Sequence, residues 1–256
     1  SVTGMSFSTH SRRCCARTLI INFQLGYHDR MVRRARTVIP GFVHHAMQLG
    51  CDHHAVFSTD QDYGLYLDFL HTAADKHGLS IWAYCLMPDH VRLIAVPGSE
   101  ESLGGAIRDA HSAFAMRHNR NQGDAGPVWQ DRFSSCVLDD LLVWSAVRLV
   151  ESIPVLSGIA DKAEDYPWSS AAAHCGLRRD EVLADSFPPP GAIDDWSEWL
   201  TGATKEAALD TRILLHTRTG HPCGTAPFIE DLEQQTGRIL RPQRRGPKPR
   251  SQGRKR

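Results

Sequence analysis

Two apolar segments separated by a short turn constrain the fold of this chain more than any other feature. Residues 79–87 and 91–96 are rich in apolar and aromatic side chains, and Pro88 and Asp89 lie between them. Both segments have the length of a buried strand, and Pro-Asp is a typical turn dipeptide. Pro97 and Gly98 end the second segment. The pattern therefore predicts an antiparallel hairpin.

A strand and a helix are expected before this hairpin. Residues 42–48 are short and extended in character, and residues 61–77 carry apolar side chains at helical spacing. We expect Asp60 to cap this helix, because Asp is a preferred N-cap residue. We expect Gly78 to end it, because Gly adopts the left-handed conformation that closes many helices.

Three further elements are expected after the hairpin. The pattern predicts a helix over 102–120, a strand over 132–138 and a helix over 139–153, which ends at Pro154 because proline has no backbone N–H. The first six elements then follow the order strand, helix, strand, strand, helix, strand, which is typical of the ferredoxin-like arrangement. We predict an α+β fold: a ferredoxin-like antiparallel sheet with helices on one face, plus a C-terminal helical extension.

Composition divides the chain into four parts. Residues 1–30 are expected to be an unstructured or overlong N-terminal extension, with Met31 as a candidate true start. Residues 31–175 are expected to form the main domain, and residues 176–236 a helical C-terminal extension. Residues 237–256 are rich in Pro, Gly, Arg and Lys, and we expect a disordered basic tail because this composition cannot bury a core.

The formal net charge of zero hides a strong segregation of charge. The tail contains nine Arg and Lys and no acid, and residues 1–36 contain seven Arg and one Asp. Residues 37–236 contain 13 basic and 28 acidic residues. The basic ends indicate contact with a polyanion, whereas the acidic remainder lacks the broad positive surface that nucleic-acid-binding domains usually show.

Other features of the sequence limit its location. It contains no apolar run of about 18 residues, so we expect no membrane partner. The apolar run at 19–23 is shorter than that of a signal peptide, and we expect a cytoplasmic protein. The seven cysteines include no C-x-x-C pair, and we expect most of them to be buried thiols.

Four separated blocks resemble the HUH tyrosine transposases, especially the REP-associated tyrosine transposases of the insertion-sequence-200-like family. Residues 82–94 read WAYCLMPDHVRLI, which is similar to the family's WAYCLMPNHVHLI. Residues 128–133 read VWQDRF and residues 148–155 read RLVESIPV, similar to LWQGRF and RYVELNPV. The block AEDYPWSS follows at 163–170. The blocks keep the family's order, and the resemblance covers about residues 31–175, the expected HUH domain.

The resemblance implies a specific chemistry. In the family, two His separated by one residue on a strand hold Mg or Mn, together with a third polar ligand from the last helix. A Tyr on that helix attacks the phosphorus of a single DNA strand beside a hairpin and forms a covalent 5′-phosphotyrosine link.

This chain departs from the pattern at three of the four chemical positions. His90 matches the first metal ligand, but Arg92 stands in the place of the second, and a protonated guanidinium cannot ligate a cation. Leu149 stands in the place of the nucleophilic Tyr, and Ile153 in the place of the third ligand. Their spacing would put both on one helix face. Mg or Mn is therefore implied by the family, but we expect no productive metal binding here.

Several residues are candidates for contact with DNA. Arg92 would suit a phosphate, because guanidinium and phosphate match in geometry, or it would pair with Asp89. The predicted DNA-binding residues are Arg92, Arg132, His44, Arg33, Arg34, Arg36, Arg241, Arg244, Arg245 and Lys248.

These observations predict a DNA-binding protein of the transposase lineage, a monomer or homodimer, that acts on single-stranded or hairpin DNA and has lost strand cleavage. Two alternatives stay open from the sequence: an active metal-dependent single-strand nuclease with a non-standard site, and a non-functional relic or scaffold. The sequence places none of Tyr63, Tyr66, Tyr84 and Tyr166 as a replacement nucleophile.

Overall fold

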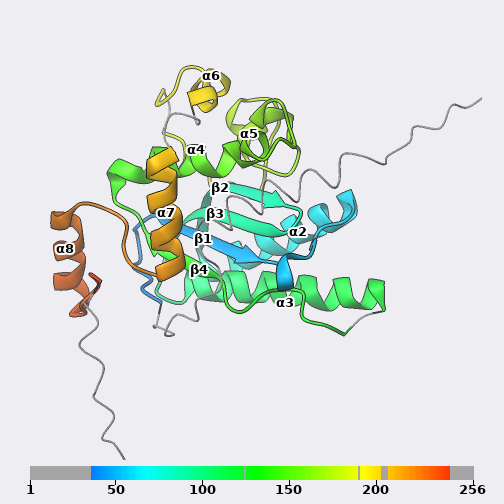
Figure 1. Ribbon diagram of the computed structural model, residues 1–256, viewed down its shortest axis with the longest axis horizontal. Helices are drawn as coiled ribbons and strands as arrows, with labels where there is room; N and C mark the ends of the chain where they lie inside the picture. Colours follow the sequence, from blue (N-terminus) through cyan, green and yellow to red (C-terminus); the bar gives the residue numbers. More distant parts are fainter. Residues whose placement is uncertain (1–35, 124, 190, 203–206, 243–256) are drawn as a thin grey trace, which may run out of the picture.

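A single antiparallel sheet forms the centre of the molecule (Figure 1). The computed structural model describes residues 36–123, 125–189, 191–202 and 207–242. The strands are β1 (His44–Leu49), β2 (Leu79–Met87), β3 (His90–Pro97) and β4 (Ser134–Val137), in the spatial order β2-β3-β1-β4. This is the strand order of a ferredoxin-like sheet, and the predicted α+β fold class is confirmed.

The predicted hairpin is formed by β2 and β3, with Met87 opposite His90 next to the turn. The predictions for residues 1–30 and for most of the tail lie outside the described residues.

Two long helices, α2 (Asp60–His77) and α3 (Ser102–Gln122), cover one face of the sheet. Tyr66 and Leu70 of α2 and Phe114 of α3 pack in one apolar cluster with Leu93 of β3. Side chains alternate along a strand, so this face takes every second residue of β3.

The N-cap of α2 is Thr59, one residue before the predicted Asp60. The Thr59 hydroxyl accepts a hydrogen bond from the Asp62 N–H, and the Asp62 carboxylate accepts one from the Thr59 N–H at 2.9 Å. This reciprocal capping box satisfies two backbone donors at once, which a cap at Asp60 would not do. Gly78 ends the helix in the left-handed conformation, as predicted.

The opposite face of the sheet is covered by α4 (Asp140–Leu156), so the sheet carries helices on both faces. This layer is an addition to the predicted arrangement. The helix was predicted to end at Ile153, but it continues through Pro154 to Leu156, three residues further. Pro154 has no N–H to donate to the Val150 carbonyl, whereas the Ser157 N–H donates to the Ile153 carbonyl at 2.9 Å, so the helical hydrogen bonds resume after the proline.

Both edges of the sheet are covered by segments from later in the chain. At the β2 edge, the Ser170 N–H donates to the Tyr84 carbonyl at 3.0 Å. At the β4 edge, the Cys223 N–H donates to the Val137 carbonyl at 2.8 Å. An exposed strand edge invites pairing with other chains, and these contacts remove that liability.

The remaining helices are short or peripheral. They are η1 (Cys51–His53), η2 (Ala163–Asp165), α5 (Ala171–His174), α6 (Trp196–Leu200), α7 (Ala207–Thr219) and α8 (Ala226–Thr236). The helices α7 and α8 lie within residues 176–236, and the apolar residues of α7 are few. Ile213 and Thr217 of α7 are nevertheless fully buried, and α7 packs on β4 and β1. None of the described helices is long and apolar enough to cross a membrane.

Candidate functional site

The four positions that correspond to the family's chemistry converge on the sheet face beneath α4. In the β2–β3 register, His90 lies opposite Met87 and Arg92 lies opposite Cys85. Residues directly opposite each other point to the same face of a sheet. Cys85 and Met87 belong to the apolar cluster that contains Leu149 and Ile153 of α4. The fold therefore brings the predicted positions together.

His90 is held as a neutral imidazole. Its side chain is 1% exposed, and its Nδ1 is 2.7 Å from the Asp89 carboxylate. Because a carboxylate only accepts, Nδ1 carries the proton and Nε2 keeps its lone pair. Burial lowers the pKa of His90, and the hydrogen bond to Asp89 opposes this shift. Among the described residues, Nε2 has no hydrogen-bond partner.

Arg92 adds a buried positive charge to the same face. The residue is 4% exposed. Burial, followed by the charge of Arg92, lowers the pKa of His45 to about 3. Asp89 directs its carboxylate to His90, with Nδ1 of His90 at 2.7 Å. A buried guanidinium in this place repels cations, which is unfavourable for a divalent metal.

Leu149 and Ile153 contribute aliphatic side chains to this face. They are 4% and 5% exposed and pack in the apolar cluster. A hard divalent cation takes several oxygen ligands, and the described residues contain no group of three or more His, Cys, Asp or Glu that could hold one. The residue set offers one imidazole nitrogen beside a guanidinium, so it does not fit the metal that the family resemblance implies.

The four described tyrosines are engaged elsewhere. Burial raises the pKa of Tyr63 to about 12, and its ring stacks on Trp168 at 4.8 Å. The Tyr84 hydroxyl donates to the Asp180 carboxylate at 2.6 Å, and burial followed by Asp180 raises its pKa.

The hydroxyl groups of Tyr166 and Tyr66 are also hydrogen-bonded inside the fold. The Tyr166 hydroxyl donates to the Leu86 carbonyl at 2.7 Å. The Tyr66 hydroxyl lies 2.9 Å from Nε2 of His111, and burial raises the pKa of Tyr66. A nucleophile needs access to substrate, and all four tyrosines are buried. Burial also raises the pKa of Tyr63, Tyr66 and Tyr84, which disfavours the reactive phenolate.

His44 is a core residue rather than a surface contact. It is fully buried, the Ile39 N–H donates to its Nε2 at 3.2 Å, and its Nδ1 donates to the Phe42 carbonyl at 2.8 Å. Burial lowers the pKa of His44 to about 4. The predicted contact with DNA is corrected here, because both ring nitrogens are used inside the fold.

Two predicted arginines meet on the surface. The Arg36 guanidinium lies 3.6 Å above the ring of Phe133 and donates from Nε and Nη2 to the Phe133 carbonyl at 3.2 and 3.1 Å. Arg132 precedes Phe133 and is exposed. Burial, followed by the charge of Arg132, lowers the pKa of Arg36 to about 10.

Of the other predicted cations, the structure describes Arg241 in addition to Arg92. Arg241 forms an ion pair with Glu233 at 2.5 Å. Arg33, Arg34, Arg244, Arg245 and Lys248 lie outside the described residues.

Sequence reasoning missed a buried polar network behind α4. The Glu151 carboxylate is fully buried and accepts hydrogen bonds from the Ser170 hydroxyl, from Nδ1 of His174 at 2.6 Å and from Nε1 of Trp196 at 2.7 Å. The network connects α4 with α5, α6 and the segment at the β2 edge. Its signal in the sequence is a single acid within an apolar helix, which by itself does not reveal its partners.

Comparisons with known proteins complete this description. No family model matches the sequence, and no curated protein matches it. One similar solved structure is a REP-associated tyrosine transposase bound to a REP hairpin, with 18% identity, a TM-score of 0.48, and coverage of 63% of this chain and 96% of that chain. Another is a protein of Deinococcus radiodurans R1 described as a transposase, with 19% identity, a TM-score of 0.33, and coverage of 43% and 88%.

Proposed function

We propose that this protein binds single-stranded or hairpin DNA and has no tyrosine-dependent strand cleavage. The observation that carries the proposal is the pair Leu149 and Ile153, which lie in hydrocarbon on the face that also holds His90 and Arg92. The positions expected to supply an oxygen nucleophile and a metal ligand supply neither.

The residues at these positions lack the atoms that strand cleavage needs. Formation of a phosphotyrosine bond needs a hydroxyl oxygen that attacks phosphorus, and an aliphatic side chain has none. A divalent ion would also be needed to stabilise the charge that develops on the phosphate. His90 can supply one nitrogen ligand, but Arg92 places a fixed positive charge beside it. We therefore propose that Mg and Mn are not bound productively at this face.

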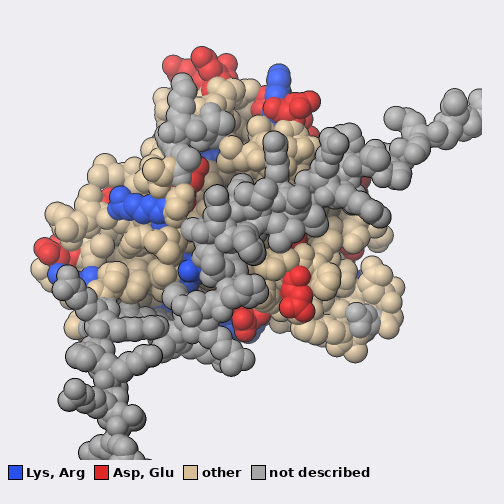
Figure 2. Space-filling view, viewed as in Figure 1, with Lys and Arg blue, Asp and Glu red and all other residues tan. Residues whose placement is uncertain are grey.

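Support for DNA binding comes from the distribution of positive charge. Arg36 and Arg132 lie together on the surface, and nine Arg and Lys follow in the sequence of the tail. Residues 161–198 contain nine acids and three bases, and acidic side chains gather over α5 and α6 in Figure 2. A polyanion would avoid that end of the molecule, so we place the DNA on the side of Arg36.

The test measures binding and cleavage on the same samples. Labelled hairpin and unstructured single-stranded DNA are mixed with the wild-type protein and Mn²⁺. We expect binding that weakens steeply with salt, with neither nicked DNA nor a covalent protein–DNA adduct on denaturing gels.

Each other outcome has a definite meaning. A covalent adduct with the wild-type protein would contradict the proposal. Nicking without an adduct that His90→Ala abolishes would favour a nuclease that uses metal-activated water. Absence of binding at low salt would favour a relic or scaffold.

A further inference from the structure

A surface groove lies apart from the face beneath α4. It has a volume of about 550 Å³ and lies between residues 36–40, the start of α3 and the end of α8. In Figure 1, α3 begins on the side of the molecule where α8 lies. The residues that matter for its chemistry are Arg36, Thr37, Glu100, Gly104, Thr236 and Arg238. Its volume is that of a site for a nucleotide-sized ligand.

Arg36 brings an uncompensated positive charge to this groove. It is half-buried and donates to a neutral carbonyl, and no ion pair of the described residues includes it. A partly desolvated cation without a carboxylate is costly unless an anion can reach it. Arg132 lies beside it and adds a second charge of the same sign. Arg132 does not line the groove, so its charge acts on an anion there only from a longer range than that of Arg36.

The other residues that line the groove suit the sugar-phosphate backbone of a DNA strand. Gly104 lies in the first turn of α3, and no heavy atom lies within 4 Å of the position that a Cβ would take there. Thr37 supplies a hydroxyl group and Arg238 a further cation, whereas the Thr236 hydroxyl donates to the Leu232 carbonyl at 2.7 Å and is used within α8. Glu100 is an exposed acid of the groove, and its charge opposes an anion.

We propose that this groove holds phosphodiester groups of a single DNA strand. The inference rests on the proposed function and extends it, because α8 contributes to the groove. The C-terminal extension is then part of the DNA-binding surface, and the strand lies outside the face that holds His90.

The first test blocks the groove without changing its charge. Gly104→Gln places a side chain in the open space of the groove, and Gly64→Gln is the matched control. Gly64 also lies within a helix, has no heavy atom within 4 Å of a Cβ position, and does not line the groove. Fluorescence anisotropy with a labelled single-stranded oligonucleotide should show binding about tenfold weaker for Gly104→Gln, the effect of losing one charge-assisted contact. Gly64→Gln should bind like the wild type.

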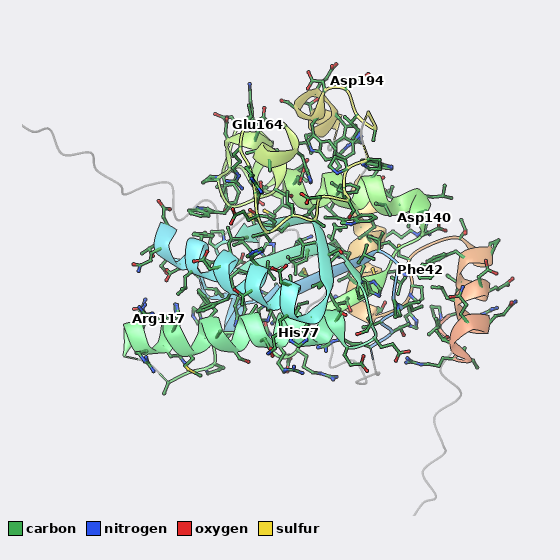
Figure 3. All side chains as sticks on the ribbon, turned by 180° about the vertical axis from the view of Figure 1, so that it is seen from behind. Phe42, His77, Arg117, Asp140, Glu164 and Asp194 are labelled. Carbon is green, nitrogen blue, oxygen red and sulfur yellow. The ribbon has the colours of Figure 1, made fainter. Side chains whose placement is uncertain are left out.

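The second test changes the charge in opposite directions. Arg36→Gln should weaken binding and reduce the slope of log affinity against log salt by about one. Glu100→Gln should strengthen binding by about two- to fivefold, because it removes the opposing charge. Arg117→Gln is the control for Arg36→Gln, because Arg117 is exposed at the end of α3 far from α8 (Figure 3). Thermal melts check that Arg36→Gln still folds, and Glu100→Gln tests the idea on an exposed residue.

The outcomes separate this inference from the proposed function. If the wild type binds DNA and neither Gly104→Gln nor Glu100→Gln changes the affinity, the groove is not the strand site, although DNA binding stands. If the wild type binds no DNA, the proposed function itself fails. If inorganic phosphate shifts the melting of the wild type but not of Gly104→Gln, while the two proteins bind DNA equally, the groove takes a free anion and the inference is overturned.

Discussion

The most deeply buried histidines on the two faces of the sheet differ in their hydrogen bonds. On the α2 and α3 side, both ring nitrogens of His44 are engaged, and Tyr66 is hydrogen-bonded to His111. On the α4 side, Nε2 of His45 and Nε2 of His90 have no partner among the described residues. A buried polar atom without a partner lowers the free energy of unfolding by about 1–3 kcal/mol. An apolar residue in the same place would make the protein more stable.

The contrast is confined to these histidines, because Oγ of Ser135, which lies opposite Ala46 on the α2 and α3 side, also has no partner among the described residues. Departures from packing rules in an otherwise consistent fold concentrate at functional positions. The α4 face keeps His90 with a fixed tautomer, yet the residues that should act with it are aliphatic. Variants at Glu151, Tyr66 and His90 and the dependence of stability on pH test this difference, from the largest expected effect to the smallest.

The largest effect is expected at Glu151, which connects the α4 layer with the C-terminal segments. Glu151→Ala should lower the free energy of unfolding by about 3–5 kcal/mol, because three donors lose their buried acceptor. Urea denaturation followed by tryptophan fluorescence measures it. Glu181→Ala, at an exposed acid, should change the free energy by no more than about 0.5 kcal/mol. Similar values for the two variants would show that the network does not hold the layer together.

Tyr66 tests a buried hydrogen bond on the α2 and α3 side of the sheet. Tyr66→Phe should cost about 1–2 kcal/mol, because Nε2 of His111 loses its partner in a buried place while the packing volume is nearly kept. Thermal and urea unfolding give the value. A neutral Tyr66→Phe would mean that the hydrogen bond on this side is not needed for stability.

The buried histidines make stability depend on pH in a defined window. Burial lowers the pKa of His111 to about 3, and His45 and His44 have values of about 3 and about 4, all below the ordinary 6.5. Their contribution is complete above pH 6.5 and is lost as pH falls from 6.5 toward 4, because the unfolded chain takes up protons that the folded chain does not. Each should contribute a slope of about 1.4 kcal/mol per pH unit.

Unfolding free energies at pH 7 and pH 5 measure this loss. NMR titration of the ring C–H signals checks the cause, since these three rings should stay neutral at pH 5. Protonation of any of them in the folded protein at pH 5 would contradict the assignment for that residue.

The smallest effect is expected at His90. His90→Leu loses one hydrogen bond to the partly exposed Asp89, but it also removes a buried nitrogen that the described residues leave without a partner. We expect a change within about 0.5 kcal/mol. A cost as large as that of Tyr66→Phe would erase the difference between the faces and show that His90 stabilises the fold.

The parts of the fold that the sequence predicted are those that local patterns specify. The hairpin follows from two apolar runs around Pro88, and the resemblance to the transposase blocks implied that His90 and Leu149 lie at one site. The local details that failed depend on competing contacts. Thr59 is the cap in place of Asp60 because of a reciprocal pair of hydrogen bonds, and the helix continues past Pro154 to a hydrogen bond from the Ser157 N–H to the Ile153 carbonyl.

Contacts between distant segments were not predictable from periodicity. The helix α7 is held by tertiary burial of Ile213 and Thr217. His44 looked like a polar surface residue beside His45, and only the bonds to Ile39 and Phe42 reveal it as a core residue. The groove at Arg36 joins segments about 200 positions apart in the sequence, such as Arg36 and Arg238, so no local pattern indicates it.

The most direct test of the account restores the missing chemistry. The wild type, an Arg92→His, Leu149→Tyr, Ile153→Asn triple variant and an Arg92→His, Ile153→Asn control are each incubated with single-stranded hairpin DNA and Mn²⁺. Denaturing protein gels then detect covalent adducts. The account predicts an adduct only with the triple variant, because only that protein has both metal ligands and a tyrosine hydroxyl on this face. An adduct with the wild type, or with the control that lacks the tyrosine, would contradict it.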